Sequence, residues 1–494
     1  MTVNDYLKLV DDVIDRGPYK DTWESLCRHP EPEWYKAAKF GIFIHWGVYS
    51  VPAFAHEWYS RTMYIKDSPE YHHHIKTYGK HKDFGYKDFI PMFKAENFDA
   101  DEWIALIKDS GAKYMMPVAE HHDGFQMYDS DLSKWNASQM GPCRDVIGEL
   151  KQAAEKNGIV LGLSSHRAEH CWFFNGGLEF ESDINDPESE DFYGEQMAGQ
   201  GDDQVTKNVR LCPPPVWHCE NWLARTVEII EKYRPSVIYF DWWVHNAGFR
   251  PYLKKFTAYY YNRALELGFD AAINYKQSAF PPDAAIFDVE RGHLDRMRMR
   301  LWQTCTASAR NSWCHTTNND YKDPVGLVTN LVDVVSKNGC MLLNIGPKSD
   351  GSITDEEKNI LRSIGKWLKQ NGEGIYGTSC WSIFGEGPTN IKTGEFTDST
   401  SLIYTSEDIR FTYNCGILYA FIMKYPKDGI IKINSLRKDM AIQSLGDSPE
   451  VSKVSVLGFD NPVSFTVDEI AMTVQVEGEI QTEYPVCIKI NLLD

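Results

Sequence analysis

Residues 237–241 read Val237-Ile238-Tyr239-Phe240-Asp241, four apolar or aromatic residues that end in a carboxylate. An apolar run without polar alternation is typical of a strand that is buried on both faces, as in a parallel sheet. Seven similar runs occur between about residues 38 and 375, separated by stretches that include helical patterns. The eight predicted strands cover residues 40–45, 114–118, 159–164, 237–240, 271–274, 285–289, 301–305 and 341–345. They predict an α/β fold, a (β/α)8-like barrel rather than an open sheet.

The series of helical patterns closes at a predicted capping box. Thr354 and Glu357 stand three residues apart before an amphipathic stretch, and Asn371-Gly372 supplies a stop signal. After Gly377 the pattern changes to period-2 alternation, which favours an antiparallel β-sandwich. We therefore expect a catalytic barrel domain over residues 1–378, with an N-terminal helical extension, and an all-β C-terminal domain over residues 379–494.

One insertion, near residues 176–215, interrupts the barrel pattern. Glu179 to Asp203 contains ten acidic residues and no Lys or Arg. Such a composition predicts a segment outside the core. It is either a solvated excursion or a lid over an active site, since loops at the carboxyl ends of barrel strands build such sites.

Composition excludes several classes of function. With 51 basic and 70 acidic residues the net charge is −19, which disfavours binding to nucleic acid or an anionic membrane surface. No apolar run is long enough to span a bilayer, and the N-terminal residues are acidic rather than typical of a signal peptide, so we expect a cytoplasmic protein. The 11 cysteines include no CxxC pair, and His72-His73-His74 is interpreted as a solvated loop rather than a metal site. No metal and no cofactor is expected.

Polar residues cluster where the predicted strands stop, and these ends meet at the active-site face of a barrel. The cluster holds several His, several Trp and several carboxylates, found in His45-Trp46, Glu57-Trp58, His121-His122, Asp241 and Glu290. Paired carboxylates among aromatic residues are typical of glycoside hydrolysis. Asp241 is the natural nucleophile, because burying a lone Asp at the end of an apolar strand is costly. Its alternative role is to cap the next helix.

Five blocks in order resemble the α-L-fucosidases of glycoside hydrolase family 29. They are Lys39–Gly47 (KFGIFIHWG), Glu57-Trp58-Tyr59, His121–Phe125 (HHDGF), Tyr239-Phe240-Asp241 and Leu342–Pro347 (LLNIGP). The resemblance implies a distorted (β/α)8-like barrel followed by a β-sandwich. It also implies a retaining exo-hydrolase that releases α-L-fucose from fucosylated glycans or oligosaccharides.

The same resemblance assigns roles to single residues. Asp241 matches the nucleophile. Glu290 is the preferred acid/base, with Glu57 as the other candidate; Glu57 otherwise matches a fucose ligand, and Glu290 otherwise forms a surface ion pair with Arg291. The further substrate-binding candidates are His45, Trp46, Trp58, His121, His122, Tyr239 and Trp313. Any one of these His or Trp residues could instead be ordinary core packing.

Two positions depart from the family pattern. His166 stands where many members have a Tyr, and Lys276 stands where the family usually has Arg. Lys is a poorer bidentate donor, so its contact with the nucleophile or the sugar is expected to differ. Two alternative functions stay open: a fucose-binding protein without catalysis, and a hydrolase of a related sugar such as an α-L-galactoside.

Overall fold

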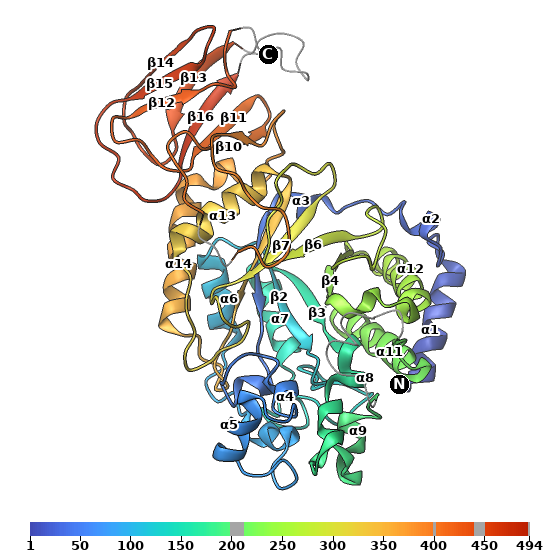
Figure 1. Cartoon of the computed structure of the whole chain (residues 1–494). Helices are drawn as coiled ribbons and strands as arrows, with labels where there is room; N and C mark the ends of the chain where they lie inside the picture. Colours follow the sequence, from blue (N-terminus) through green and yellow to red (C-terminus); the bar gives the residue numbers. More distant parts are fainter. Residues whose placement is uncertain (198–211, 399–401, 439–449, 493–494) are drawn as a thin grey trace.

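The computed structural model describes residues 1–197, 212–398, 402–438 and 450–492. Its centre is a closed barrel of eight parallel strands in sequence order, with β1 paired to both β2 and β8 (Figure 1). The strands are β1 Phe40–Ile44, β2 Tyr114–Glu120, β3 Val160–Ser165, β4 Val237–Phe240, β5 Ala272–Tyr275, β6 Ile286–Glu290, β7 Trp302–Ala307 and β8 Gly339–Ile345. The predicted barrel is confirmed, and no strand end is displaced by more than two residues.

The apolar runs fold this way because both faces of each strand are covered. In β4, Ile238 and Phe240 belong to the core between strands and helices, while Val237 and Tyr239 belong to a second core inside the barrel. Every residue of β4 is buried. A uniformly apolar strand that ends in a polar residue thus places that residue at the rim of the barrel.

Helices surround the barrel unevenly. They are α1 Val3–Arg16, α2 Trp23–Leu26, α3 Glu33–Ala38, α4 Tyr59–Thr62, α5 Pro69–Thr77, α6 Ala100–Asp109, α7 Val146–Asn157, α8 His170–Phe173, α9 Glu190–Tyr193, α11 Val216–Tyr233, α12 Arg250–Leu267, α13 Pro324–Ser336 and α14 Asp355–Asn371. Residues 276–285 and 291–301, all of them described, contain no helix, so the strands β5, β6 and β7 follow one another through loops. No described helix has both the length and the apolarity needed to cross a bilayer.

Half of the predicted capping box of α14 is present, because the Glu357 carboxylate accepts hydrogen bonds from Ser308 and Gly346 instead of from the Thr354 backbone. The Thr354 side chain accepts a hydrogen bond from the Glu357 backbone N–H at 3.3 Å, and the helix gives way to Gly372. This side-chain oxygen satisfies one of the backbone donors that a helix start leaves open.

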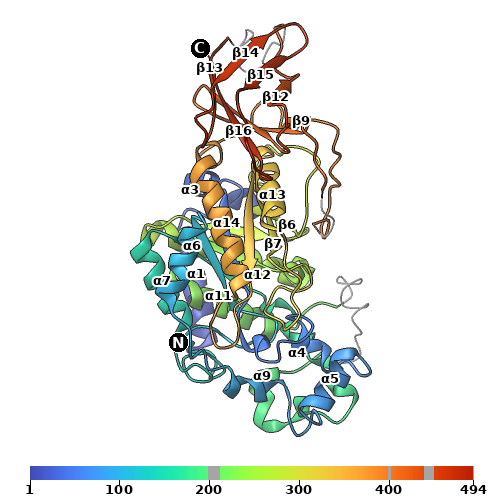
Figure 2. The ribbon, with the colours of Figure 1, turned by 90° about the vertical axis from the view of Figure 1, so that its left-hand side faces the viewer.

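The C-terminal part forms two antiparallel sheets that enclose their own apolar core, as predicted for a sandwich. Their orders are β13-β16-β11-β10-β9 and β12-β15-β14. The strands are β9 Gly385–Glu386, β10 Ile409–Asn414, β11 Ile417–Ile422, β12 Ile430–Ile433, β13 Val451–Val456, β14 Val463–Val467, β15 Met472–Val476 and β16 Val486–Leu492. The sheets lie beyond α13 and α14, at the end of the molecule opposite α4, α5 and α9 (Figures 1 and 2).

The expectation that the acidic insertion lies outside the core is wrong for its first part. Residues 175–193 form short helical turns that end in α9, and Asp183 within them is buried. The Asp183 carboxylate accepts hydrogen bonds from the hydroxyls of Tyr64 and Tyr193 and pairs with Lys87. These partners compensate for its burial. Residues 198–211 of the insertion lie outside the described residues.

The loop predicted for His72-His73-His74 is also wrong, because these residues lie in α5. The helix begins with Ser68 as its cap and Pro69 in its first turn, which are ordinary start signals. His74 is buried and its Nε2 lies 2.8 Å from the Phe84 carbonyl oxygen. The three imidazoles therefore point in different directions around a helix.

Candidate active site

A cavity of about 460 Å3 lies at the carboxyl ends of the barrel strands. Its lining combines carboxylates, imidazoles and aromatic rings: Phe43, His45, Glu57, Trp58, His121, His122, His166, Tyr239, Asp241, Trp242, Lys276, Gln277, Glu290, Trp313, Glu395 and Phe396. A larger cavity of about 780 Å3 lies between α13 and the C-terminal sheets, but none of these residues lines it. The smaller cavity is therefore the candidate active site.

Of the predicted site residues, only Trp46 does not line this cavity. Its ring packs against Phe93, Phe98 and Trp103, and its Nε1–H donates to the Lys348 carbonyl oxygen at 2.7 Å. The prediction that Trp46 binds substrate is wrong for this reason. Strand β1 ends at Ile44. His45 lines the cavity, and the Trp46 side chain points outward into the core between β1 and α6.

The two predicted catalytic carboxylates are joined by one ammonium group. Asp241 follows β4, Lys276 follows β5 and Glu290 is the last residue of β6, so three neighbouring strands supply the three groups. Lys276 Nζ lies 2.6 Å from Asp241 Oδ1 and 2.6 Å from Glu290 Oε2. The nearest oxygens of the two carboxyl groups thus lie no farther apart than twice that distance.

Burial and this shared cation give the two carboxyl groups different affinities for protons. Burial raises the pKa of Glu290 to about 7; the charge of Lys276 opposes the shift and the charge of Asp241 adds to it. Burial alone would also raise the pKa of Asp241, but the charge of Lys276 and the contact with His166 outweigh it and hold that pKa well below its ordinary value. Near neutral pH one group is ionised and the other is available as an acid. Two carboxyl groups with pKa values pushed apart are the arrangement that a nucleophile and a general acid require.

Imidazoles hold the second oxygen of Asp241. His166 Nδ1 lies 3.0 Å and His122 Nε2 3.4 Å from Asp241 Oδ2. Burial lowers the pKa of His166, so its ring is neutral and its Nδ1–H donates to the carboxylate. His166 thus makes a direct contact with the nucleophile candidate at the position where the family pattern has Tyr.

His122 also contacts a second buried carboxylate. Its Nδ1 lies 3.1 Å from Glu169 Oε2, which places the imidazole between Glu169 and Asp241. Burial by itself lowers the pKa of His122, but Glu169 and Asp241 together raise it above the ordinary value. Glu169 acts on the site through His122 and was not singled out from the sequence, although it belongs to the polar block that follows β3.

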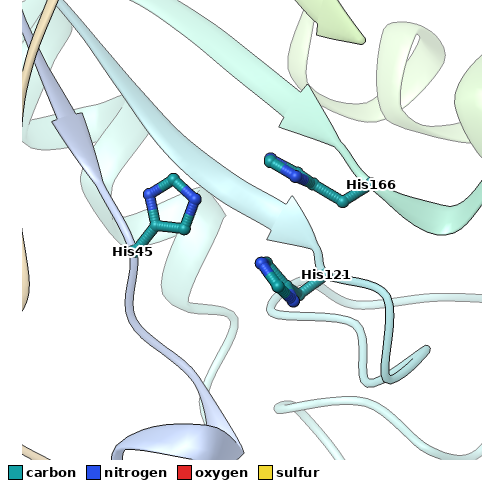
Figure 3. A group of neighbouring side chains, drawn as sticks. All are labelled: His45, His121 and His166. Carbon is teal, nitrogen blue, oxygen red and sulfur yellow. The ribbon is translucent and has the colours of Figure 1, made fainter. Parts of the chain in front are cut away.

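Three imidazoles, including that of His166, converge in the cavity. His45, His121 and His166 follow β1, β2 and β3, and Figure 3 shows their rings facing one another at the ends of these strands. His45 Nδ1 lies 2.6 Å from Asn344 Oδ1, while the Asn344 amide donates to the Trp313 carbonyl oxygen. The Asn344 oxygen can only accept, so His45 carries its proton on Nδ1 and presents Nε2 as an acceptor. Burial holds the pKa of His45 and of His121 well below the ordinary value, so both rings are neutral.

The remaining predicted residues form the cavity wall. Glu57 Oε2 accepts a hydrogen bond from the Trp313 backbone N–H at 3.0 Å, which ties the loop after β1 to the loop after β7. Trp58 packs edge-on against His122. The Tyr239 hydroxyl points into the barrel, where it donates to Asp288 Oδ2 at 3.1 Å, so that only its ring is left to face the cavity.

Matches to known families agree with this arrangement. A family model described as alpha-L-fucosidase matches residues 8–373, and one described as the alpha-L-fucosidase C-terminal domain matches residues 403–491. The chain belongs to the α-L-fucosidase family. Similar fucosidases include the rat tissue enzyme, 28% identical over 92% of this chain and 87% of the relative, and the human plasma enzyme, 31% identical over 83% and 80%. A crystal structure of Thermotoga maritima α-fucosidase in complex with fucose has a TM-score of 0.73 and 27% identity, and covers 96% of this chain and 100% of the other.

The histidine cluster of this fucosidase family member also satisfies the distance criterion for a metal site. Ligand atoms of His45, His121 and His166 lie within 4.8 Å of one another, as do those of His122, His166 and Asp241. Ring nitrogens of two of these histidines already have protein partners, since His166 Nε2 lies 3.1 Å from Ser164 Oγ and His45 Nδ1 lies 2.6 Å from Asn344 Oδ1. Neutral imidazoles with one free nitrogen suit sugar hydroxyls equally well.

Proposed function

We propose that this protein is a retaining exo-α-L-fucosidase in which Asp241 is the nucleophile and Glu290 the acid/base. The observation that carries the proposal is the bridge from Lys276 to both carboxyl groups. Because both contacts are 2.6 Å, the nearest oxygens of the two groups lie within twice that distance of each other. This favours the about 5 to 5.5 Å between the carboxyl groups of retaining glycosidases over the roughly 6.5 to 9.5 Å of inverting ones.

In the first step an oxygen of Asp241 attacks the anomeric carbon of fucose. The bond to the leaving oxygen breaks, and that oxygen takes the proton of Glu290. The products are a fucosyl ester on Asp241 and a free alcohol. The raised pKa of Glu290 and the lowered pKa of Asp241 support this assignment, because they favour a proton on Glu290 and a negative charge on Asp241 before this step.

In the second step Glu290 removes a proton from water, which attacks the same carbon and releases fucose with its configuration retained. Ester formation removes the negative charge of Asp241, one of the influences that raise the pKa of Glu290. Lys276 keeps its charge throughout and then acts on Glu290 alone. The pKa of Glu290 therefore falls in the intermediate, and the acid of the first step becomes the base of the second.

The imidazoles and aromatic rings supply binding and orientation. His45 and His121 are neutral and offer acceptors and donors to the sugar hydroxyls. Trp313 and Trp58 offer apolar surfaces, which suit a sugar that carries a methyl group in place of a hydroxyl. An α-L-galactoside, which has that hydroxyl, is therefore expected to be a poorer substrate than the matching α-L-fucoside.

The test is proton NMR of the first product formed from an aryl α-L-fucoside. Retention gives α-L-fucose before mutarotation. First-formed β-L-fucose would falsify the double displacement and the role of Asp241. Binding of fucose without any turnover would instead identify an inactive fucose-binding protein.

A further inference from the structure

One wall of the active site comes from outside the barrel. Glu395 and Phe396, which line the cavity together with Asp241 and Glu290, belong to a segment between β9 and β10. We call residues 393–398 the rim segment. It lies after the residues matched by the catalytic family model and before those matched by the C-terminal one. Figure 2 shows the chain after β9 descending from the C-terminal sheets toward β6.

The rim segment pairs with the backbone that carries the proposed acid. The Phe396 N–H donates to the Glu290 carbonyl oxygen at 2.9 Å, and the Asp398 N–H donates to the Arg291 carbonyl oxygen at 2.9 Å. His293 and Gly394 exchange two backbone hydrogen bonds in antiparallel orientation. Phe396 is therefore fixed relative to Glu290 through a single hydrogen bond.

A buried carboxylate anchors the end of the segment. Asp398 accepts hydrogen bonds from Thr306 and Lys322, and its Oδ1 lies 3.5 Å from Arg291 Nε. The approach is close on the other side as well, because a Cβ added to Gly292 would lie 2.2 Å from the Gly394 carbonyl oxygen. The segment is thus held at both ends against the loop after β6.

Phe396 is exposed although it is held firmly. The residue is 60% exposed and its φ angle is +55°, in the left-handed region. A side chain in that region costs about 1 to 2 kcal/mol, and strained residues of this kind gather at functional sites. Gln277, another cavity residue, has a φ angle of +56°. More than half of Phe396 is thus left open to solvent at the cavity, beside Glu290.

We propose that Phe396 and Glu395, with Trp242, form the subsite for the leaving group, and that this subsite takes a neutral sugar. The inference rests on the proposed function, because Glu290 must reach the oxygen that joins fucose to the leaving group. Phe396 pairs with the backbone at the end of β6, whereas Trp242 follows β4, so the two residues reach the cavity lining from strands on either side of β5. Aromatic faces stack on the C–H faces of pyranose rings. Glu395 can accept from a hydroxyl, and its charge, added to that of Asp241, repels an acidic sugar.

The experiment compares a fucosyl-hexose disaccharide with α-L-fucosyl fluoride, whose leaving group does not reach the subsite. Phe396→Ala keeps the backbone hydrogen bond to Glu290 and should lower kcat/KM for the disaccharide by roughly 3- to 10-fold while leaving the fluoride unchanged. Phe396→Trp, which keeps an aromatic face, should keep kcat/KM for the disaccharide near the wild-type value. Ile470→Ala, which truncates a 75% exposed apolar residue in the turn between β14 and β15, should change the kcat/KM of neither substrate.

A second variant tests the charge. Glu395→Lys should raise kcat/KM for a sulfated or uronic-acid disaccharide relative to the neutral one. Equal losses on both substrates in Phe396→Ala, no loss on either, or no change of charge preference in Glu395→Lys would each overturn the subsite. A wild-type protein that cleaves neither the disaccharide nor the fluoride would instead overturn the proposed function.

Discussion

Lys276 Nζ lies 2.6 Å from Glu290 Oε2, and it is equally close to an oxygen of Asp241. A single compact ammonium group thus neutralises part of the charge of both proposed catalytic carboxyl groups. An Arg, which the family pattern has here, would spread its charge over a planar fork. The charge on one nitrogen atom, Lys276 Nζ, therefore lowers the pKa of both carboxyl groups.

Removing that charge is expected to shift the whole pH profile upward. The charge of Lys276 lowers the pKa of both Asp241 and Glu290, so both rise in Lys276→Met. In the wild type, kcat/KM should fall as pH increases through about 7, because Glu290 loses the proton it must donate. In the variant this fall should occur at higher pH, and a loss of activity at low pH should appear where Asp241 becomes protonated. Lys276→Arg keeps the charge and should keep the wild-type positions of both limbs; identical profiles for Met and Arg would contradict the role of the cation.

Loss of Asp241 should abolish turnover without unfolding the protein. Asp241→Gly or Asp241→Asn removes the attacking oxygen, and removal of a covalent nucleophile costs about 10⁴-fold or more in kcat. Circular dichroism checks the fold. Azide should not restore a product of retained configuration; any rescued product should be β-fucosyl azide, formed by direct displacement. Substantial hydrolysis by the clean variant would assign the nucleophile elsewhere.

Comparison of Glu290→Ala with Glu57→Ala separates acid catalysis from sugar binding. A general acid contributes roughly 10²- to 10⁴-fold, mainly when the leaving group is poor. Glu290→Ala should therefore slow the hydrolysis of a natural oligosaccharide far more than that of an activated aryl fucoside. Glu57 holds the Trp313 backbone, and its loss should slow both substrates by a similar factor. The reverse pattern would assign the acid to Glu57.

Chelation should leave activity unchanged. Of the histidines that satisfy the distances of a metal site, His45 and His121 bind sugar hydroxyls in the proposed mechanism, while His122 and His166 hold the Asp241 carboxylate. Protein dialysed against EDTA should keep its kcat and its melting temperature, and added Zn2+ should inhibit rather than activate, because it competes for these nitrogens. Activity that is lost on dialysis and restored by a divalent ion would contradict the metal-free mechanism.

A buried ion cluster joins the two parts of the chain. Asp333 in α13 lies 2.6 Å from Lys337 Nζ and 2.6 Å from Arg410 Nε, and Arg410 belongs to β10. Asp333→Asn leaves two buried cations without their partner and should lower the free energy of unfolding by about 3 to 5 kcal/mol. Although burial opposes it, the two cations lower the pKa of Asp333, so the stabilisation is full above the ordinary Asp pKa and is lost as pH falls through the lowered one. Thermal unfolding at neutral and acidic pH measures both effects; an unchanged melting temperature at pH 7 would contradict the prediction.

The sequence pattern predicted the barrel because each strand is a continuous apolar run. A short apolar run that is buried on both faces, such as β4, is typical of a strand in a parallel sheet. The same rule located His45, His121, Asp241 and Glu290, each at or directly after the end of such a run. The rule did not hold for Trp46, because the chain turns between His45 and Trp46. The position of a strand end does not predict such a turn.

Residues placed by long-range contacts gave no local signal. Phe396 and Glu395 lie more than 100 residues beyond Glu290, in a stretch with neither strand nor helix periodicity. Their position depends on Asp398 reaching Lys322 and on backbone pairing across the loop after β6. Glu169 was visible as one polar residue among several after β3, but only its contact with His122 gives it a role.

The missing helices after β5 and β6 have a consequence for how such enzymes can diversify. These two strands position Lys276 and the proposed acid Glu290, and the loops after them leave room for the rim segment, which follows β9. The proposed catalytic groups and the proposed leaving-group subsite are thereby encoded in separate stretches of the gene. A recombination event that exchanges the 3′ part of the gene would bring in a new leaving-group preference while Asp241, Lys276 and Glu290 are inherited unchanged.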